Sequence, residues 1–247
     1  MKDPRAGLTL IEILIAVSLL SLLTVGVLWS MRIGFNTLGK TDDFLIHNRR
    51  VANSRKIIEN ELAGSLLVYA ALHPQPNETS YVPFVQSEPQ VMRFVTSYSL
   101  EDAWRGIPQL VTMRVIPGDQ GQGVRLVMEE APYLGPEQTG SLVIGREVNE
   151  ATGMFKLHFA DGAITPKAFV LADQLSECHF SYLERLYLPP YQLWRTDWVN
   201  GNAIPRAVRI DMLPLHPENT RLQVSSVSVA LPVNKTSGRF YVDVEQP

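Results

Sequence analysis

Hydrophobic and polar residues divide the chain into three stretches, and the first is almost wholly apolar. Between Glu12 and Arg32 lie the nineteen residues Ile13–Met31, none of which carries a charge. A helix of that length spans roughly 28 Å at about 1.5 Å per residue, close to the hydrocarbon thickness of a bilayer. We therefore predict a membrane-spanning helix over residues 8–31, preceded by a short segment, residues 1–7.

The second stretch, residues 32–72, has the pattern of an amphipathic helix that continues the first. It contains no proline, and its apolar residues recur at spacings of seven, four, four and three, which places them on one helical face: Val51, Ile58, Leu62, Leu66 and Tyr69. The prolines of His73-Pro74-Gln75-Pro76 are expected to end this helix, because proline lacks the backbone N–H that a helix interior needs.

The third stretch, residues 73–247, consists of short apolar or alternating runs separated by glycine and proline, which predict strands. The predicted strands are Gln90–Thr96, Leu110–Ile116, Gly123–Met128, Ser141–Ile144, Phe155–Phe159, Phe169–Ala172, Glu177–Leu183, Ala207–Leu213 and Val224–Val233. Pro117–Gly123 is predicted to be a hairpin loop, and Tyr187–Ala203 a long ordered loop. The expected fold class is α+β, with one long N-terminal helix packed on an antiparallel β-rich head domain.

Composition and charge narrow the functional classes. The net charge is −3 and the longest basic run is Arg49-Arg50, so nothing predicts nucleic-acid binding. The apolar stretch is longer than that of a secretory signal and no A-x-A site follows it, which favours a retained membrane anchor. Lys2 and Arg5 precede that anchor, and by the positive-inside rule they predict a cytoplasmic N-terminus with the bulk of the chain on the other side.

The sequence predicts no enzyme, no metal site and no cofactor. The five histidines have no metal-ligand spacing, although His158 and His179 lie in predicted strands and would have to meet in space to form a site. Cys178, the only cysteine, precedes His179, and neighbours in a strand point to opposite faces, so the two cannot form a nucleophile–base pair. Asp119 lies in a glycine-rich loop that lacks the lysine and serine of a phosphate-binding loop, which favours a turn.

Trp194 and Trp198 are candidate partner-binding residues with a simpler alternative. Tryptophan is enriched at interface hot spots, so two of them in a predicted loop are candidates for anchoring a partner. The alternative is that both pack over the sheet, which the sequence favours without excluding the first interpretation.

Glu12 is the residue that an anchor alone does not explain. An unpaired carboxylate in such a segment costs on the order of 2–3 kcal/mol on insertion scales. Either Glu12 is a stray charge that reaches the membrane interface, or it has a partner that repays this cost.

Gly7-Leu8-Thr9-Leu10-Ile11-Glu12 resembles the processing site of type IV pilins and of the pseudopilins of type II secretion. The resemblance implies a pilin-like fold, cleavage between Gly7 and Leu8 by prepilin peptidase, and N-methylation of Leu8, where the family usually has phenylalanine. It also implies that Glu12 acts in assembly. Cleavage creates a cationic α-amine at Leu8, and Glu12 of a neighbouring helix can pair with that amine inside the bilayer.

Residues 175–212 resemble the J-type minor pseudopilins, on an aromatic strand Phe180–Leu183, the paired tryptophans and the strand Ile204–Ile210. The resemblance implies a single-pass protein of the bacterial inner membrane with a periplasmic head. It implies a fibre-tip complex with the I, K and H types of minor pseudopilin, and contact with the major pseudopilin and with the secretin or cargo. A minor pilin of a type IV pilus is an alternative interpretation, and an anchored enzyme or receptor is a third.

Overall fold

The computed structural model describes residues 9–75, 77–100, 107–150, 153–162, 165, 168–217 and 222–232, with backbone alone at 36–43 and 120. The predicted leader, residues 1–7, lies outside the described residues. The chain forms two compact units that divide between Arg49 and Arg50.

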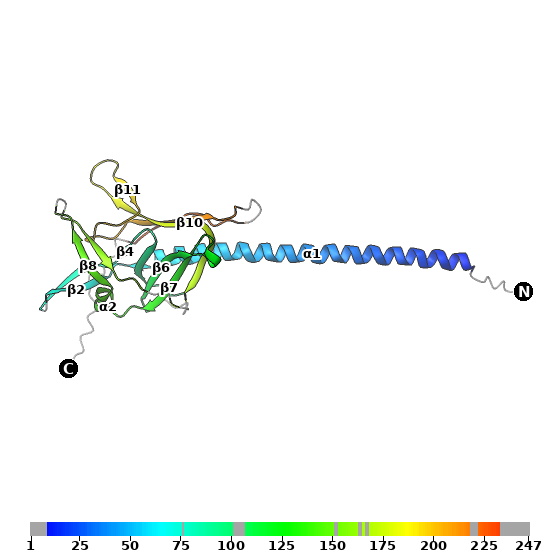
Figure 1. Ribbon diagram of the computed structural model, residues 1–247, viewed down its shortest axis with the longest axis horizontal. Coiled ribbons are helices and arrows are strands. Elements are labelled where there is room, and N and C mark those ends of the chain that lie inside the picture. The colour runs from blue at the N-terminus through cyan, green and yellow to red at the C-terminus, as the bar shows by residue number, and fades with distance from the viewer. Residues whose placement is uncertain are drawn as a thin grey trace, which may run out of the picture. The chain divides into compact units, whose positions relative to one another are not determined.

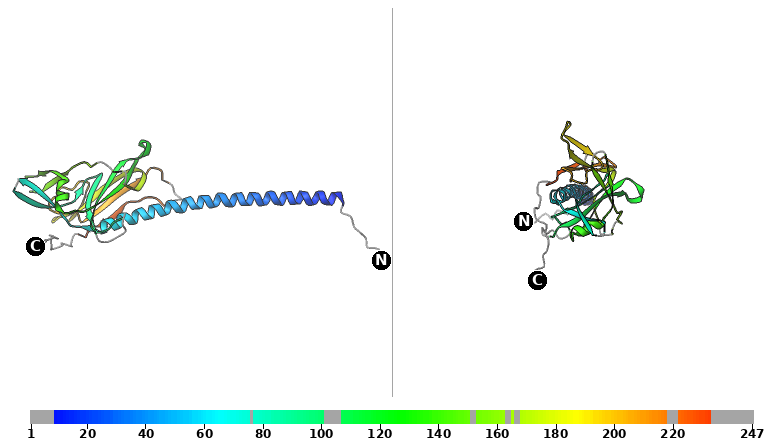
Figure 2. Two further views of the ribbon diagram at one scale, coloured as in Figure 1. Left: turned by 90° about the horizontal axis from the view of Figure 1, so that it is seen from below. Right: turned by 90° about the vertical axis from the view of Figure 1, so that its left-hand side faces the viewer.

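One continuous helix joins the two predicted helical stretches. Helix α1 runs over Leu10–Ala63, 54 residues (Figure 1), and Figure 2 shows it unbroken as its colour changes from blue to cyan. The glycines at 34 and 39 do not interrupt it. Its first part is the predicted membrane segment, and its last turns belong to the β-rich unit.

The prediction that this helix extends to Leu72 is wrong, because it ends nine residues earlier. The N–H of Gly64 closes the last turn on the carbonyl of Asn60 at 2.8 Å, and a Cβ at Gly64 would lie 2.7 Å from the Thr96 hydroxyl. Only glycine fits so close to the neighbouring strand. The chain then pairs with that strand, Ser65 opposite Thr96, so sheet formation overrides the helical spacing of Leu66 and Tyr69.

The head domain is built on a nine-stranded antiparallel sheet. Its main order is β1-β5-β6-β7-β10-β12-β13, with β4 paired to β5 and β11 paired to β10 (Figure 1). The strands are β1 Ser65–Leu66, β4 Gln86–Ser87, β5 Val91–Thr96, β6 Gln109–Pro117, β7 Val124–Pro132, β10 Phe169–Arg185, β11 Gln192–Arg195, β12 Ala207–Pro214 and β13 Val227–Ala230.

Two hairpins form separate two-stranded sheets beside the large one. They are β2 Tyr69–Gln75 with β3 Glu78–Pro83, and β8 Val143–Val148 with β9 Phe155–Phe159. The short helix α2, Pro136–Ser141, contacts β2, where a Cβ at Gly140 would lie 1.9 Å from the carbonyl oxygen of Ala71. The α+β fold class is therefore confirmed, with a long N-terminal helix followed by an antiparallel β-rich head.

Most predicted strands are confirmed, and two predictions need correction. The predicted strands at 169–172 and 177–183 are one strand, β10, with register shifts between Val170 and Glu177. The predicted loop Tyr187–Ala203 contains β11. The loop Pro117–Gly123 is confirmed: it joins β6 to β7 through a 3-10 turn, and Gly123 has a φ of +63°.

The last turns of α1 supply one side of the main core. Ile58 and Leu62 are buried among side chains of the large sheet, including Phe180, Tyr182 and Ile210. The predicted apolar face is therefore confirmed at these two positions, which both belong to the β-rich unit.

Glu61, an ionisable residue, lies on the same buried face of α1. Its side chain is 0% exposed, and neither of its carboxyl oxygens accepts a hydrogen bond from a described donor. Burial and the neighbouring carboxylate of Glu130 raise the pKa of Glu61 to about 9. Glu130 in turn accepts hydrogen bonds from the Ser99 hydroxyl and the Leu100 N–H. At neutral pH Glu61 is therefore a protonated, uncharged acid beside Glu130.

This pKa predicts how the stability of the head depends on pH. Below pH 4.5 Glu61 is protonated in both the folded and the unfolded chain, whereas between pH 4.5 and about 9 the unfolded chain alone loses the proton. The free energy of unfolding should therefore fall as pH rises through this window. Glu61→Gln removes the titration and keeps a donor. Denaturant unfolding of the full chain in detergent at pH 5, 7 and 8.5 should give a flatter pH dependence for Glu61→Gln, and parallel profiles would contradict the assignment.

Candidate functional site: the N-terminal segment

Helix α1 begins in a way that places Glu12 in its first turn. The carbonyl of Thr9 accepts hydrogen bonds from the N–H groups of Glu12 at 3.1 Å and Ile13 at 3.3 Å, so Thr9 occupies the N-cap position. The unpaired N–H groups and the positive end of the helix dipole favour a carboxylate in this turn. Gly7 and Leu8, the predicted cleavage site, lie outside the described residues.

The helix that follows is apolar on every side and uncovered. Leu10–Phe35, 26 residues, is long and apolar enough to cross a membrane, and none of it is buried within the chain. An amphipathic surface helix would show one polar face, whereas here the exposed side chains include leucine, isoleucine and valine all round. Lipid or the helices of other subunits must therefore cover this surface.

Three hydroxyl groups inside the apolar segment are bonded to its own backbone. Ser18, Ser21 and Thr24 donate to the carbonyl groups four residues earlier, at 2.8, 2.8 and 2.7 Å. Such bonds remove the cost of an unpaired hydroxyl in hydrocarbon. Glu12 differs, because no cation within the described part of the chain forms an ion pair with it. The segment thus presents one unpaired carboxylate at the end of an uncovered apolar helix.

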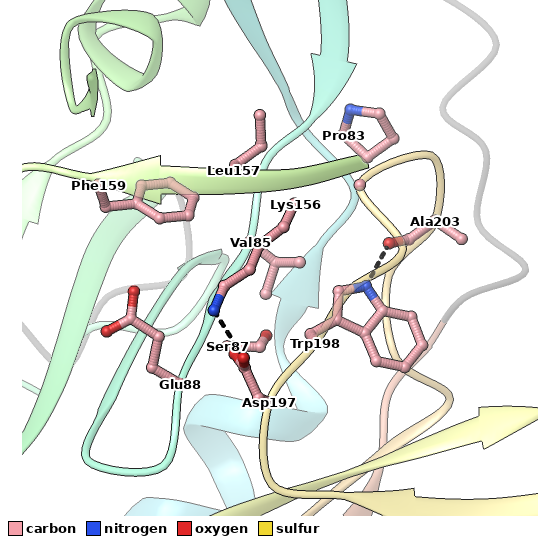
Figure 3. Close-up of a pocket in the computed structure, with 11 residues that line it drawn as sticks. Pro83, Val85, Ser87, Glu88, Lys156, Leu157, Phe159, Asp197, Trp198 and Ala203 are labelled. Carbon is pink, nitrogen blue, oxygen red and sulfur yellow. Dashed lines mark hydrogen bonds and ion pairs between the residues drawn. The ribbon is translucent and has the colours of Figure 1, made fainter. Parts of the chain in front are cut away.

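Trp198 packs inside the head, which corrects its assignment as a partner-binding residue. Its side chain is 8% exposed and belongs to the main core cluster. The indole N–H donates to the carbonyl groups of Asn200 at 2.8 Å and Ala203 at 2.9 Å, and Figure 3 shows the second of these bonds. Beside it, the Lys156 ammonium pairs with Asp197 at 2.6 Å. The alternative interpretation, packing over the sheet, describes this residue.

Trp194 lies on β11 and is half-buried. It stands opposite Leu183 of β10, and the Arg209 guanidinium stacks over its ring with a distance of 4.7 Å to the centroid. Its indole therefore has one face occupied within the chain. The two tryptophans that the sequence groups together are thus in different environments.

Exposed apolar side chains gather instead at the tip of the β10–β11 hairpin, which projects from the large sheet (Figure 1 and Figure 2). Tyr187 is fully exposed, Leu188 is 76% exposed and Tyr191 is 59% exposed. The Leu186 N–H donates to the Tyr191 carbonyl at 2.8 Å, which closes the tip. The sequence analysis missed these residues, and the signal available was the apolar run around Pro189-Pro190.

His158 and His179 lie on different sheets and have different partners. His158 lies 3.2 Å from Glu147 in the β8–β9 hairpin, whereas His179 lies on the large sheet between Glu177 and Asp211. Within the described residues no group of three or more histidine, cysteine, aspartate or glutamate side chains is arranged to hold a metal ion. Burial raises the pKa of the Cys178 thiol to about 12, so this cysteine is a poor nucleophile.

Comparison with known protein families identifies a motif in the N-terminal segment. A family model of the prokaryotic N-terminal methylation motif matches residues 2–28. No curated protein matches the chain. The match supports a pilin-like protein, either a pilin or a pseudopilin, that is processed by prepilin peptidase and assembles with other pilin-like subunits. Gly7, Leu8 and Glu12 all lie within the matched residues.

The buried position of Trp198 predicts a loss of stability on truncation. Trp198→Ala should lower the free energy of unfolding by about 3–5 kcal/mol, because it leaves a cavity in the core and two carbonyl groups without their donor. Trp194→Ala is the matched control and should cost clearly less. Denaturant unfolding of both variants measures the difference, and equal effects would contradict the distinction between the two residues.

The processing site predicts the fate of a blocked precursor. Gly7→Asp should prevent cleavage, because the peptidase of this class reads the glycine before the cleaved bond, and the chain should remain in the membrane at its full mass. Ala6→Ser, one residue earlier, is the control and should be cleaved normally. Intact-mass analysis of membrane extracts from cells with a prepilin peptidase distinguishes the two forms, and a cleaved Gly7→Asp chain would argue against the site.

Proposed function

We propose that this protein is a minor pseudopilin of a type II secretion system, of the J type, and acts in the complex that initiates the pseudopilus. The motif at residues 2–28 and the helix-plus-head architecture support a pilin-like subunit. The J-type assignment is supported by the aromatic strand Phe180–Leu183, Trp194 and the strand at 207–210, which lie on β10, β11 and β12. Both β11 and β12 pair directly with β10.

The observation that carries the proposal is the position of Glu12. Its carboxylate lies in the first turn of a helix that is apolar and uncovered on all sides, with no described cation beside it. Cleavage after Gly7 would place a cationic α-amine at Leu8, four residues away, which corresponds to an axial offset of about 6 Å. The Glu12 carboxylate of one subunit then neutralises the Leu8 amine of the next, and both charges enter the bilayer as a pair.

This pairing would also set the order of events in assembly. A precursor has no amine at Leu8, so its helix has no cation at the level where the neighbouring Glu12 needs one. Only a processed chain completes the pair, and the fixed offset between Leu8 and Glu12 fixes the axial register between subunits. Processing is in this way a condition for assembly rather than a separate maturation step.

The remaining assignments follow from the same role. Lys2 and Arg5 place the N-terminus in the cytoplasm and the head in the periplasm, with one passage through the inner membrane. Partners would be the I, K and H types of minor pseudopilin, the major pseudopilin, and the secretin or cargo. The exposed tip at Tyr187, Leu188 and Tyr191 offers apolar surface of the kind that protein interfaces bury. We assign the head no catalytic activity.

The role of Glu12 can be tested by separating cleavage from assembly. Glu12→Gln keeps the shape and removes the charge, so the chain should still be processed, but recovery of pilin-like subunits with the tagged protein should fall at least about tenfold, since tenfold corresponds to about 1.4 kcal/mol of lost interaction. Ser21→Ala, which alters a hydroxyl already bonded within the helix, is the control. Undiminished recovery with Glu12→Gln would contradict the pairing.

The choice of secretion machinery needs a different readout. Deletion of the gene should leave exoproteins trapped in the periplasm while surface pili remain, and the wild-type chain should restore export. Loss of pili with normal export would instead identify a minor pilin. A mature protein that still begins at Met1 would favour an anchored enzyme or receptor and overturn both pilin-like assignments.

A further inference from the structure

The β10–β11 hairpin projects from the large sheet (Figure 1 and Figure 2). The ladder between β10 and β12 ends at Tyr182 opposite Val208, whereas the ladder between β10 and β11 continues to Arg185 opposite Gln192. The tip of the hairpin, residues 186–191, therefore lies beyond the end of the β10–β12 ladder.

This tip is closed by its own backbone. The Leu186 N–H donates to the Tyr191 carbonyl at 2.8 Å, and the Tyr191 N–H donates to the Leu188 carbonyl at 2.9 Å. The Gln192 N–H donates to the Pro190 carbonyl at 2.8 Å. Because these bonds hold the backbone from which the exposed side chains extend, little conformational entropy would be lost when a partner binds them.

The tip and the strand after it are apolar and carry no charge. From Leu186 to Trp194 the chain has no aspartate, glutamate, lysine, arginine or histidine. Tyr187, Leu188 and Tyr191 are exposed, and neither hydrophobic core of the described residues includes them. These side chains therefore add nothing to the packing of their own head, and a partner that covered them would gain the free energy of burying apolar surface.

The charges at the base of the hairpin argue against a lipid surface as that partner. The Arg195 Nε donates to the buried Glu184 carboxylate at 2.5 Å, so these two charges are paired within the chain. Arg185 is exposed and is the one further cation between Leu183 and Arg195. Recognition of anionic lipid headgroups typically uses clusters of about four to eight cations. A single arginine beside an apolar tip is better matched by a protein pocket.

Two grooves of the described head argue against a second copy of the chain as the partner. A groove of about 640 Å³ is formed by residues of β2, β3, α2 and β8, and its lining includes Glu78, Glu137 and Arg146. A smaller groove, of about 230 Å³, has Asp119 and Asp173 in its lining. An uncharged tip that entered either groove would remove charged groups from water without pairing them, which is unfavourable.

We propose that the tip of the β10–β11 hairpin inserts into an apolar, uncharged pocket on a different pilin-like subunit. Tyr187 and Leu188 would fill this pocket, and acceptor groups at its rim would bind the hydroxyls of Tyr187 and Tyr191. An acidic residue beside the pocket would match the exposed Arg185. The class of partner rests on the proposed function, whereas the chemistry of the pocket follows from the tip itself.

Photocrosslinking tests the contact and identifies the partner. p-Benzoylphenylalanine replaces Tyr187 in the tagged full chain, in cells that carry the other pilin-like subunits, and the membranes are irradiated. Mass spectrometry should find an adduct with a different protein that has an N-terminal methylation motif. The control carries the same group in place of Leu134, which is 79% exposed in the loop between β7 and α2, and should not form this adduct.

The other outcomes of this experiment contradict the proposal. An adduct with a second copy of the chain, or with lipid, would overturn the assignment of a different subunit, and the absence of any adduct at position 187 would overturn the contact. Processing at Leu8 and Glu12-dependent recovery of pilin-like subunits test the proposed function separately. A processed chain that recovers those subunits but forms no adduct at position 187 contradicts the tip contact alone.

Serine substitutions at the tip separate binding from stability. Tyr187→Ser combined with Leu188→Ser should lower recovery of the crosslinked subunit at least about tenfold. The thermal unfolding midpoint of the head should not change, because both side chains lie outside the two cores. Leu134→Ser removes a leucine as exposed as Leu188 and should change neither quantity. Undiminished recovery with the tip variant would overturn the proposal.

Discussion

A carboxylate at the edge of a membrane helix must find a cation, give up its charge or leave the apolar region, and this constraint governs how the N-terminal unit can function. The described helix offers Glu12 no ion pair, while the hydroxyl groups of Ser18, Ser21 and Thr24 are bonded to its own backbone. Glu12 is the one charged side chain between Leu10 and Met31. We propose that the partner for Glu12 is the amine that prepilin processing would create at Leu8 of a neighbouring chain.

In the head domain, a carboxyl group without a cationic partner is accommodated in a different way. Glu61 is fully buried, and burial together with the neighbouring Glu130 raises its pKa, so it remains protonated at neutral pH. The same residue type is thus accommodated in two ways along one helix. In the head a carboxyl group loses its charge because the packed core excludes water, whereas at the N-terminus we propose that a carboxylate keeps its charge because assembly supplies a cation.

The sequence was sufficient for features set by local periodicity. The apolar run predicted the membrane helix, and the spacing of Ile58 and Leu62 predicted the buried face. The end of the helix was not predictable in this way, because it depends on a close approach between Gly64 and Thr96, which are far apart in the sequence. Glu61 could have been found, since it lies three residues after Ile58 and hence on the apolar face.

The environments of Trp194 and Trp198 also could not be predicted from the local sequence pattern. Residue type made Trp194 and Trp198 candidates for binding, but burial depends on what folds over them, and the carbonyl groups of Asn200 and Ala203 enclose Trp198. Exposed apolar residues include Tyr187, Leu188 and Tyr191, on a hairpin that the sequence pattern assigned to a loop. Strand β11 pairs with β10 as a hairpin, with Arg185 opposite Gln192, and the alternation of residues alone did not reveal this pairing.

The central claim, that Glu12 pairs with the processed amine of a neighbouring subunit, can be tested by direct chemical capture. Dicyclohexylcarbodiimide enters the bilayer, activates a carboxylate and joins it to an adjacent amine with loss of water, while the carbodiimide becomes a urea. In membranes that contain the assembled protein, mass spectrometry should find a peptide in which the side chain of Glu12 is linked to the N-terminal amine of a neighbouring pilin-like subunit. If Glu12 is recovered only as its unlinked carbodiimide adduct, the carboxylate has no amine beside it and the account is contradicted.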